Sequence, residues 1–149
     1  MSKTFFSTTR LVCAALFFLL LAGVTAHAAE SALKLEAQLV VGSNDSHQTN
    51  GIPVSAQVAK KLARLPLKWQ YYFVISSQQF SVSKDRAKEV SLSGDCQIFV
   101  QTFGDEEVQL TLMSNGRNIG KIKQTLPKGH TIVAGGNAGN SIVVLRQAD

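Results

Sequence analysis

Cys96, His47 and His130 are the residues whose side chains best suit catalysis in this 149-residue chain. A nucleophilic cysteine needs a neighbouring base and an electropositive setting. The two histidines lie in separate turn-rich segments, and nothing in the spacing places either beside Cys96. The alternating run 96–100 instead predicts a small buried side chain on a strand. Two distant histidines also give no Ser-His-Asp arrangement, so the sequence predicts no enzyme.

Metal and phosphate ligands follow no recognisable spacing. His47 with Asp45 and Asn44 is the cluster that most resembles a metal site, within the polar loop 42–51. Zinc needs three or four nitrogen or sulfur ligands and calcium needs regularly spaced carboxylates, and this loop supplies neither. The glycine-rich run 135–140 lacks the Gly-Lys-Ser/Thr of a phosphate loop and precedes a strand-like segment. We expect no catalytic residue, no metal and no cofactor.

Two groups of side chains suggest ligand binding without catalysis. Trp69, Tyr71 and Tyr72 would suit an aromatic platform for a sugar or a peptide, although alternating aromatic residues on a strand more often belong to a core. Four basic residues between positions 60 and 68 would suit nucleic acid or anionic lipid, but the solvated face of any amphipathic helix has this composition. We expect a core role for the aromatic residues and a solvated role for the basic ones.

The elements that must position these residues are one helix and many short strands. Leu33–Val41 alternates between apolar and polar residues, which predicts a strand with one buried face. Pro53 opens a helical pattern and Pro66 ends it, which predicts one amphipathic helix near 53–65. Its apolar stripe consists of Val54, Val58, Leu62 and Leu65.

The chain after Pro66 predicts strands separated by turns. Lys68–Ser76 is apolar on both faces, with Trp69, Tyr71, Phe73 and Ile75 sharing one, which is typical of a covered central strand. The charged segment 84–88 predicts a hairpin or a sheet-crossing loop, and Asn115-Gly116 predicts a type I′ hairpin turn. The total of about nine short strands favours an antiparallel β-sandwich over an open barrel.

The first 28 residues have the three parts of a secretory signal peptide. Lys3 and Arg10 precede the apolar run 11–24, and Ala26–Ala28 forms a small-x-small cleavage site. The run is shorter than the roughly 20 residues that span a bilayer. We therefore expect residues 1–28 to be removed and residues 29–149 to form a single β-rich domain, periplasmic or secreted, with no membrane span. Cys96 would then be the only cysteine, which excludes an intrachain disulfide.

Composition and charge limit the classes of partner. With 45% hydrophobic and 17% charged residues, the chain has the composition of a globular domain. Removal of residues 1–28 takes away two basic residues and no acidic one, which lowers the net charge from +5 to +3. A charge this small does not argue for a nucleic-acid partner.

Residues 129–136, Gly-His-Thr-Ile-Val-Ala-Gly-Gly, resemble the G-x-T-x-V-x-G-G stretch near the end of the secretin channel domain of bacterial outer-membrane secretion systems. The layout of the chain is also similar to that of small exported proteins of Gram-negative bacteria with no assigned function. These resemblances imply a periplasmic or envelope-associated role and transfer no site residues.

The leading hypothesis for function is a non-enzymatic exported domain that binds a protein or an envelope component. Two alternatives remain open. The first is a secreted hydrolase or hydrolase inhibitor with a site in the loop 42–51. The second is a carbohydrate-binding module that uses Trp69, Tyr71 and Tyr72.

Overall fold

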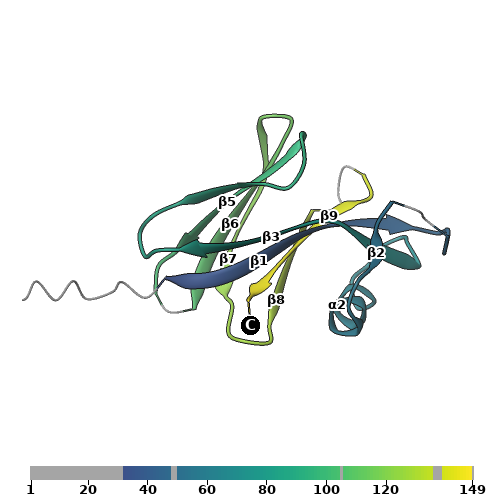
Figure 1. Ribbon diagram of the computed structural model, residues 1–149, viewed down its shortest axis with the longest axis horizontal. Coiled ribbons are helices and arrows are strands. Elements are labelled where there is room, and N and C mark those ends of the chain that lie inside the picture. The colour runs from purple at the N-terminus through teal and green to yellow at the C-terminus, as the bar shows by residue number, and fades with distance from the viewer. Residues whose placement is uncertain (1–31, 48–49, 105, 136–138, 149) are drawn as a thin grey trace, which may run out of the picture.

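Nine strands in two antiparallel sheets and one short helix make up the described part of the chain (Figure 1). The computed structural model describes residues 32–47, 50–104, 106–135 and 139–148, so the predicted signal peptide lies outside the described residues. The elements are β1 (Leu33–Ser43), β2 (Ile52–Pro53), α2 (Ala56–Leu62), β3 (Tyr71–Val82), β4 (Lys88–Ser91), β5 (Cys96–Thr102), β6 (Glu107–Ser114), β7 (Arg117–Thr125), β8 (Thr131–Gly135) and β9 (Ser141–Gln147). The predicted β-sandwich of about nine strands with one helix is confirmed.

The two sheets are open and face each other. Sheet A has the strand order β2-β3-β1-β9-β8, and sheet B has the order β4-β5-β6-β7. The chain crosses from sheet A to sheet B after Val82, so of the two predicted alternatives for the charged segment 84–88 the sheet crossing is the one observed, with Lys88 as the first residue of β4. It returns to sheet A between β7 and β8. The sheets lie close together at the end where the chain crosses between them, and they diverge toward the β6–β7 hairpin (Figure 1).

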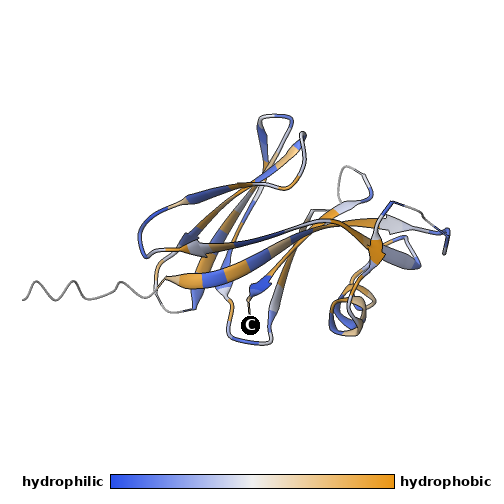
Figure 2. Ribbon diagram, viewed as in Figure 1, coloured by the Kyte–Doolittle hydropathy of each residue, from blue (hydrophilic) through white to orange (hydrophobic). Residues whose placement is uncertain are grey.

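The main core fills the space between the sheets. Alternate residues of β1 point into it, and Figure 2 shows the resulting alternation of hydrophobic and hydrophilic residues along this strand. Burial of these side chains is the main source of the stability of the sandwich. The buried residues of this core are Leu35, Ala37, Leu39, Val82, Val90, Leu92, Ile98, Val100, Val108, Leu110, Leu112, Leu126, Ile132, Ala134, Val143 and Leu145.

A second apolar cluster lies on the outer face of sheet A, where α2 packs (Figure 1). Val58 and Leu62 of the helix belong to this cluster together with Val40 of β1. Glu36 of β1 is also buried on this face. The prediction that β1 buries only one face is therefore wrong. The strand lies in the middle of sheet A, with sheet B opposite one face and α2 over the part of the other face that contains Val40.

The helix is shorter than the predicted 53–65. Pro53 pairs with Phe73 as part of β2 and does not open the helix. Ser55 is the N-cap, because its hydroxyl oxygen accepts a hydrogen bond from the backbone N–H of Val58. Leu65, predicted in the stripe, follows the helix but still packs against the same cluster.

A β-bulge changes the predicted pattern of β3. Leu39 of β1 pairs with Ser76 and the next residue, Val40, pairs with Val74, so Ile75 is an extra residue on β3. The predicted common face of Trp69, Tyr71, Phe73 and Ile75 does not extend to Trp69, which precedes β3 and packs with Tyr72 and Val74 in the second cluster. On the strand itself Phe73 is buried, whereas Tyr71 and Ile75 are exposed. Beyond Ile75 the alternation of inward and outward side chains along β3 is shifted by one residue. The apolar alternation of the sequence does not predict such a shift.

The predicted Asn-Gly hairpin is confirmed between β6 and β7. Asn115 has φ 48° and Gly116 has φ 72°, the two positive values that a type I′ turn requires. A second bulge follows on β7, because Leu112 pairs with Gly120 and Met113 pairs with Asn118. Ile119 is therefore the extra residue of sheet B, as Ile75 is of sheet A.

Candidate binding cleft between the sheets

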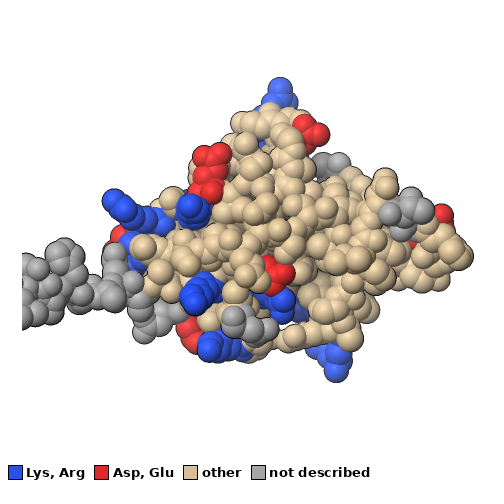
Figure 3. Space-filling view, viewed as in Figure 1, with Lys and Arg blue, Asp and Glu red and all other residues tan. Residues whose placement is uncertain are grey.

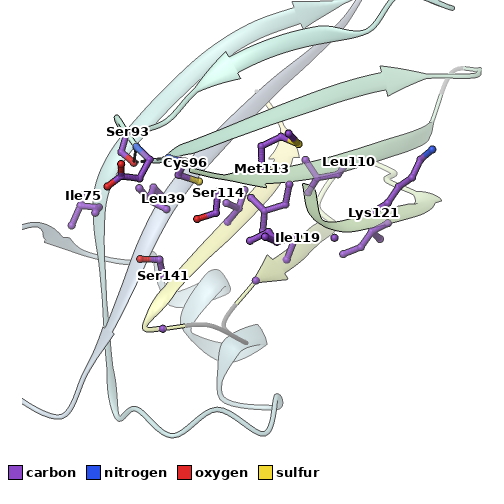
Figure 4. Close-up of a pocket in the computed structure, with 18 residues that line it drawn as sticks. Leu39, Ile75, Ser93, Cys96, Leu110, Met113, Ser114, Ile119, Lys121 and Ser141 are labelled. Carbon is purple, nitrogen blue, oxygen red and sulfur yellow. Dashed lines mark hydrogen bonds between the residues drawn. The ribbon is translucent and has the colours of Figure 1, made fainter. Parts of the chain in front are cut away.

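A cleft of about 550 Å³ opens between the two sheets at the end where they diverge (Figure 4). This volume falls within the range of about 300–1,000 Å³ that is usual for ligand sites. Most of the lining is apolar and continues the main core outward. The apolar side chains come from sheet A (Leu39, Ile75, Ala134, Val143) and from sheet B (Leu110, Leu112, Met113, Ile119, Ile122).

The two bulge isoleucines line this cleft from opposite sheets (Figure 4). Ile75 is 44% exposed and Ile119 is 51% exposed, although both side chains are large and apolar. A bulge re-aims the side chain of its extra residue, and here each sheet uses one to present an isoleucine at the same opening. The cleft therefore offers two apolar contacts on opposing walls.

Hydrogen bonds donated by backbone N–H groups hold the sheet B side of the opening. The hydroxyl oxygen of Ser93 accepts hydrogen bonds from the backbone N–H groups of Asp95 and Cys96, at 3.3 and 3.1 Å. The backbone N–H of Asn115 donates to the carbonyl oxygen of Asp95 at 2.9 Å, which ties the loop before β5 to the β6–β7 hairpin. Hydroxyl groups of Ser93, Ser114 and Ser141 add polar partners to the lining.

Cys96 lies in the cleft and is half-buried. Burial raises the pKa of its thiol, so the protonated form predominates at neutral pH. The described lining contains no histidine, and both His47 and His130 are exposed elsewhere. A thiol with a raised pKa and no adjacent base has none of the features that activate a nucleophile.

The polar loop between β1 and β2 is a solvated turn where it is described. Asp45 Oδ1 accepts a hydrogen bond from the backbone N–H of His47 at 2.8 Å, and the hydroxyl of Ser43 accepts one from the N–H of Asp45. Within the described ranges, no three His, Cys, Asp or Glu side chains gather where they could hold a metal ion. The glycine-rich run 135–140 lies partly outside those ranges, at 136–138.

The aromatic residues considered as a platform are split between core and surface. Trp69 and Tyr72 are half-buried in the cluster around α2, and the Tyr72 hydroxyl donates to the carbonyl oxygen of Trp69 at 3.1 Å. The indole packs directly on Gly42, where an added Cβ would lie 2.5 Å from Trp69 Cδ2. Of the three, only Tyr71 is exposed, so they do not present a common flat surface.

The exposed charged residues include those of α2 and those of β7. Lys60, Lys61 and Arg64 are exposed on and just after α2, as predicted. On the face seen in Figure 3 the charged side chains lie mostly around the margins and leave a broad uncharged area across the centre. Within the described ranges, no helix has the length and apolar character needed to cross a membrane.

The cleft was not found from the sequence. Ile75 and Ile119 fit the alternation of their strands, and a bulge leaves no change of period in the sequence. The one available signal was Gly120, since a glycine inside a strand often marks a bulge. No protein-family model, curated protein or solved structure matches this chain.

Proposed function

We propose that this protein is an exported, non-enzymatic binding module and that the cleft between its sheets is the binding site. The observation that carries the proposal is the pair of exposed isoleucines, Ile75 and Ile119, on opposite walls of one apolar cleft. The ligand is an apolar part of another protein or of an envelope component. The signal-like residues 1–28 support export.

The energetics favour an occupant in this cleft. Full burial of an isoleucine side chain is worth about 1.5–3 kcal/mol, so covering two half-exposed ones would contribute on the order of 2 kcal/mol. The core residues beneath them extend the apolar contact inward. Exposed apolar surface rimmed by polar groups is typical of binding sites.

The chemistry of the alternatives has less support. Hydrolysis would need an activated nucleophile, and Cys96 has a raised pKa and no histidine among the described residues around it. A site in the loop after β1 would rest on His47, whose neighbour Asp45 is engaged in a local turn. Carbohydrate binding through Trp69 would require an indole that is already packed on Gly42.

The test is binding of the apolar dye Nile red to the purified protein. Saturable fluorescence is expected, and Ile119→Asp or Ile75→Asp should weaken it by about tenfold, because a carboxylate would have to be desolvated in the cleft. Ile52→Asp is the matched control. Ile52 is 69% exposed and lies outside the cleft, so its variant should bind as the unmodified protein does.

Cys96 supplies a second, independent measurement. Because its thiol lines the cleft, bound dye should slow alkylation of Cys96 by iodoacetamide. Trp69 lies in the other apolar cluster, so its fluorescence reports folding in every variant. Equal dye binding by the two cleft variants and the Ile52→Asp control, or alkylation unaffected by the dye, would refute the proposal.

A further inference from the structure

Two unpaired strand edges border the cleft. β7 is the last strand of sheet B and β8 the last strand of sheet A, and both contribute to the lining. Each therefore has one row of backbone N–H and C=O groups without a strand partner in the described chain. The cleft thus combines an apolar interior with backbone donors and acceptors at its side.

The charged residues of β7 and of its connection to β8 are all basic. Residues 117–135, which include both edge strands and their connection, contain four basic residues and no acidic one. Only Lys123 of these four forms an ion pair within the described structure, with Glu107 at 3.3 Å. The Lys121 side chain lies at the margin of the cleft with its amine directed away from the apolar lining (Figure 4). Asp95 also lines the cleft, and its backbone carbonyl accepts a hydrogen bond from Asn115 of the β6–β7 hairpin, so the lining contains one acidic residue beside the basic residues of β7 and its connection to β8.

We infer that the occupant is an extended segment of another protein that adds to the edge of β7 as a further strand. Its alternate apolar side chains enter the cleft, and its acidic flanks face the basic residues of β7 and the β7–β8 connection. This inference rests on the proposed function and specifies its ligand. In strand addition, main-chain hydrogen bonds give affinity and the pockets for alternate side chains give specificity.

Charge and hydrogen bonding distinguish this occupant from two others. Antiparallel pairing of β7 with β7 of a second copy would bring the basic side chains of both strands together, which is destabilising. An acyl chain would fill the apolar interior but would leave the backbone groups of the edge without partners. An extended acidic and apolar peptide satisfies the cleft, the edge and the charge together.

The probe is a synthetic nine-residue peptide, matched to the nine residues of β7, with alternating valine and threonine between terminal glutamates. It should bind saturably and slow alkylation of Cys96. N-methylation of alternate peptide bonds, which removes the donors of one edge, should weaken binding by about tenfold. Exchanging the glutamates for lysines should weaken it similarly, and so should the double variant Arg117→Glu with Lys121→Glu in the protein. Lys61→Glu on α2 is the control and should leave the peptide affinity unchanged.

The outcomes separate the two proposals. Binding of Nile red or oleate without binding of the peptide would overturn strand addition and leave the cleft as a site for acyl chains. Equal binding of the methylated and unmethylated peptides would also overturn it. A dimer in sedimentation that Lys121→Glu stabilises would assign the edge to a second copy. Failure of both dye and peptide to bind would overturn the proposed function as well.

Discussion

At the scale of single residues, Glu36 has the most demanding environment. It lies on the outer face of sheet A and is 7% exposed. Its carboxylate accepts hydrogen bonds from the Ser77 hydroxyl and the Gln38 amide at 2.8 Å, and it forms an ion pair with Arg146. Burial alone would raise the pKa of Glu36, but the hydrogen bonds from Ser77, Gln38 and Arg146 and the charge of Arg146 hold it below its ordinary value.

The lowered pKa of Glu36 predicts that the free energy of unfolding decreases as the solution becomes acidic. A carboxyl group whose pKa is lower in the folded chain stabilises it above the ordinary pKa of about 4.5, and this stabilisation is lost as pH falls through the folded value. Glu36→Gln should lower the free energy of unfolding by about 1–3 kcal/mol at pH 7 and by less at lower pH. Urea unfolding from pH 7 to pH 3 measures both effects.

Glu107→Gln is the control for this prediction. Glu107 pairs with Lys123, but both side chains are about half exposed, so the variant should stay within about 0.5 kcal/mol of the unmodified protein. Unfolding curves of Glu36→Gln that run parallel to those of the unmodified protein across the pH range would contradict the role given to Glu36.

At the scale of elements, α2 illustrates how a short helix is fixed by packing. The residues of α2 are compatible with a helix, but an isolated helix of seven residues would not be stable in water. Burial of Val58 and Leu62 against sheet A supplies the stability. The apolar stripe is thus part of a core, so it is not free to serve as a partner-binding surface.

Leu62→Ala should therefore destabilise the protein by about 2–5 kcal/mol, because Leu62 is fully buried and the substitution leaves a cavity. Lys61→Ala, one residue earlier on the exposed face, should remain within about 0.5 kcal/mol of the unmodified protein. Thermal or chemical unfolding measures both variants. Equal stability of the two would mean that α2 does not pack on the sheet.

At the scale of the whole molecule, the two sheets are held together at one end and form the cleft at the other. The chain crosses between the sheets at the closed end, and the cleft at the open end is lined in part by residues of the main core. A ligand can enter the open end while the closed end keeps the sandwich together. This division suits a domain that must remain folded with its binding site empty.

Export, as proposed, predicts a mature chain that begins at Ala29. This position lies outside the described residues, and the prediction follows from the Ala26–Ala28 cleavage pattern. Intact mass spectrometry of the exported protein measures the new N-terminus. A product that retains the apolar run 11–24 would contradict export by signal cleavage. It would not bear on ligand binding by the cleft, which is tested separately.

The sequence by itself determined the class of fold, the Asn-Gly hairpin and the presence of a single helix, whereas for the segment 84–88 it allowed both a hairpin and a sheet-crossing loop. These features depend on local properties: alternation of apolar residues, positive φ at Asn115 and Gly116, and an apolar stripe with helical spacing.

Only the tertiary structure decided where the cleft lies and which residues form it. Ile75 and Ile119 are exposed because each is the extra residue of a bulge, and a bulge is defined by pairing with another strand. Burial of both faces of β1 and the packing of Trp69 on Gly42 likewise depend on neighbours distant in sequence. Periodicity records which residues alternate along one strand, whereas register and sheet order decide which side of that strand meets the core.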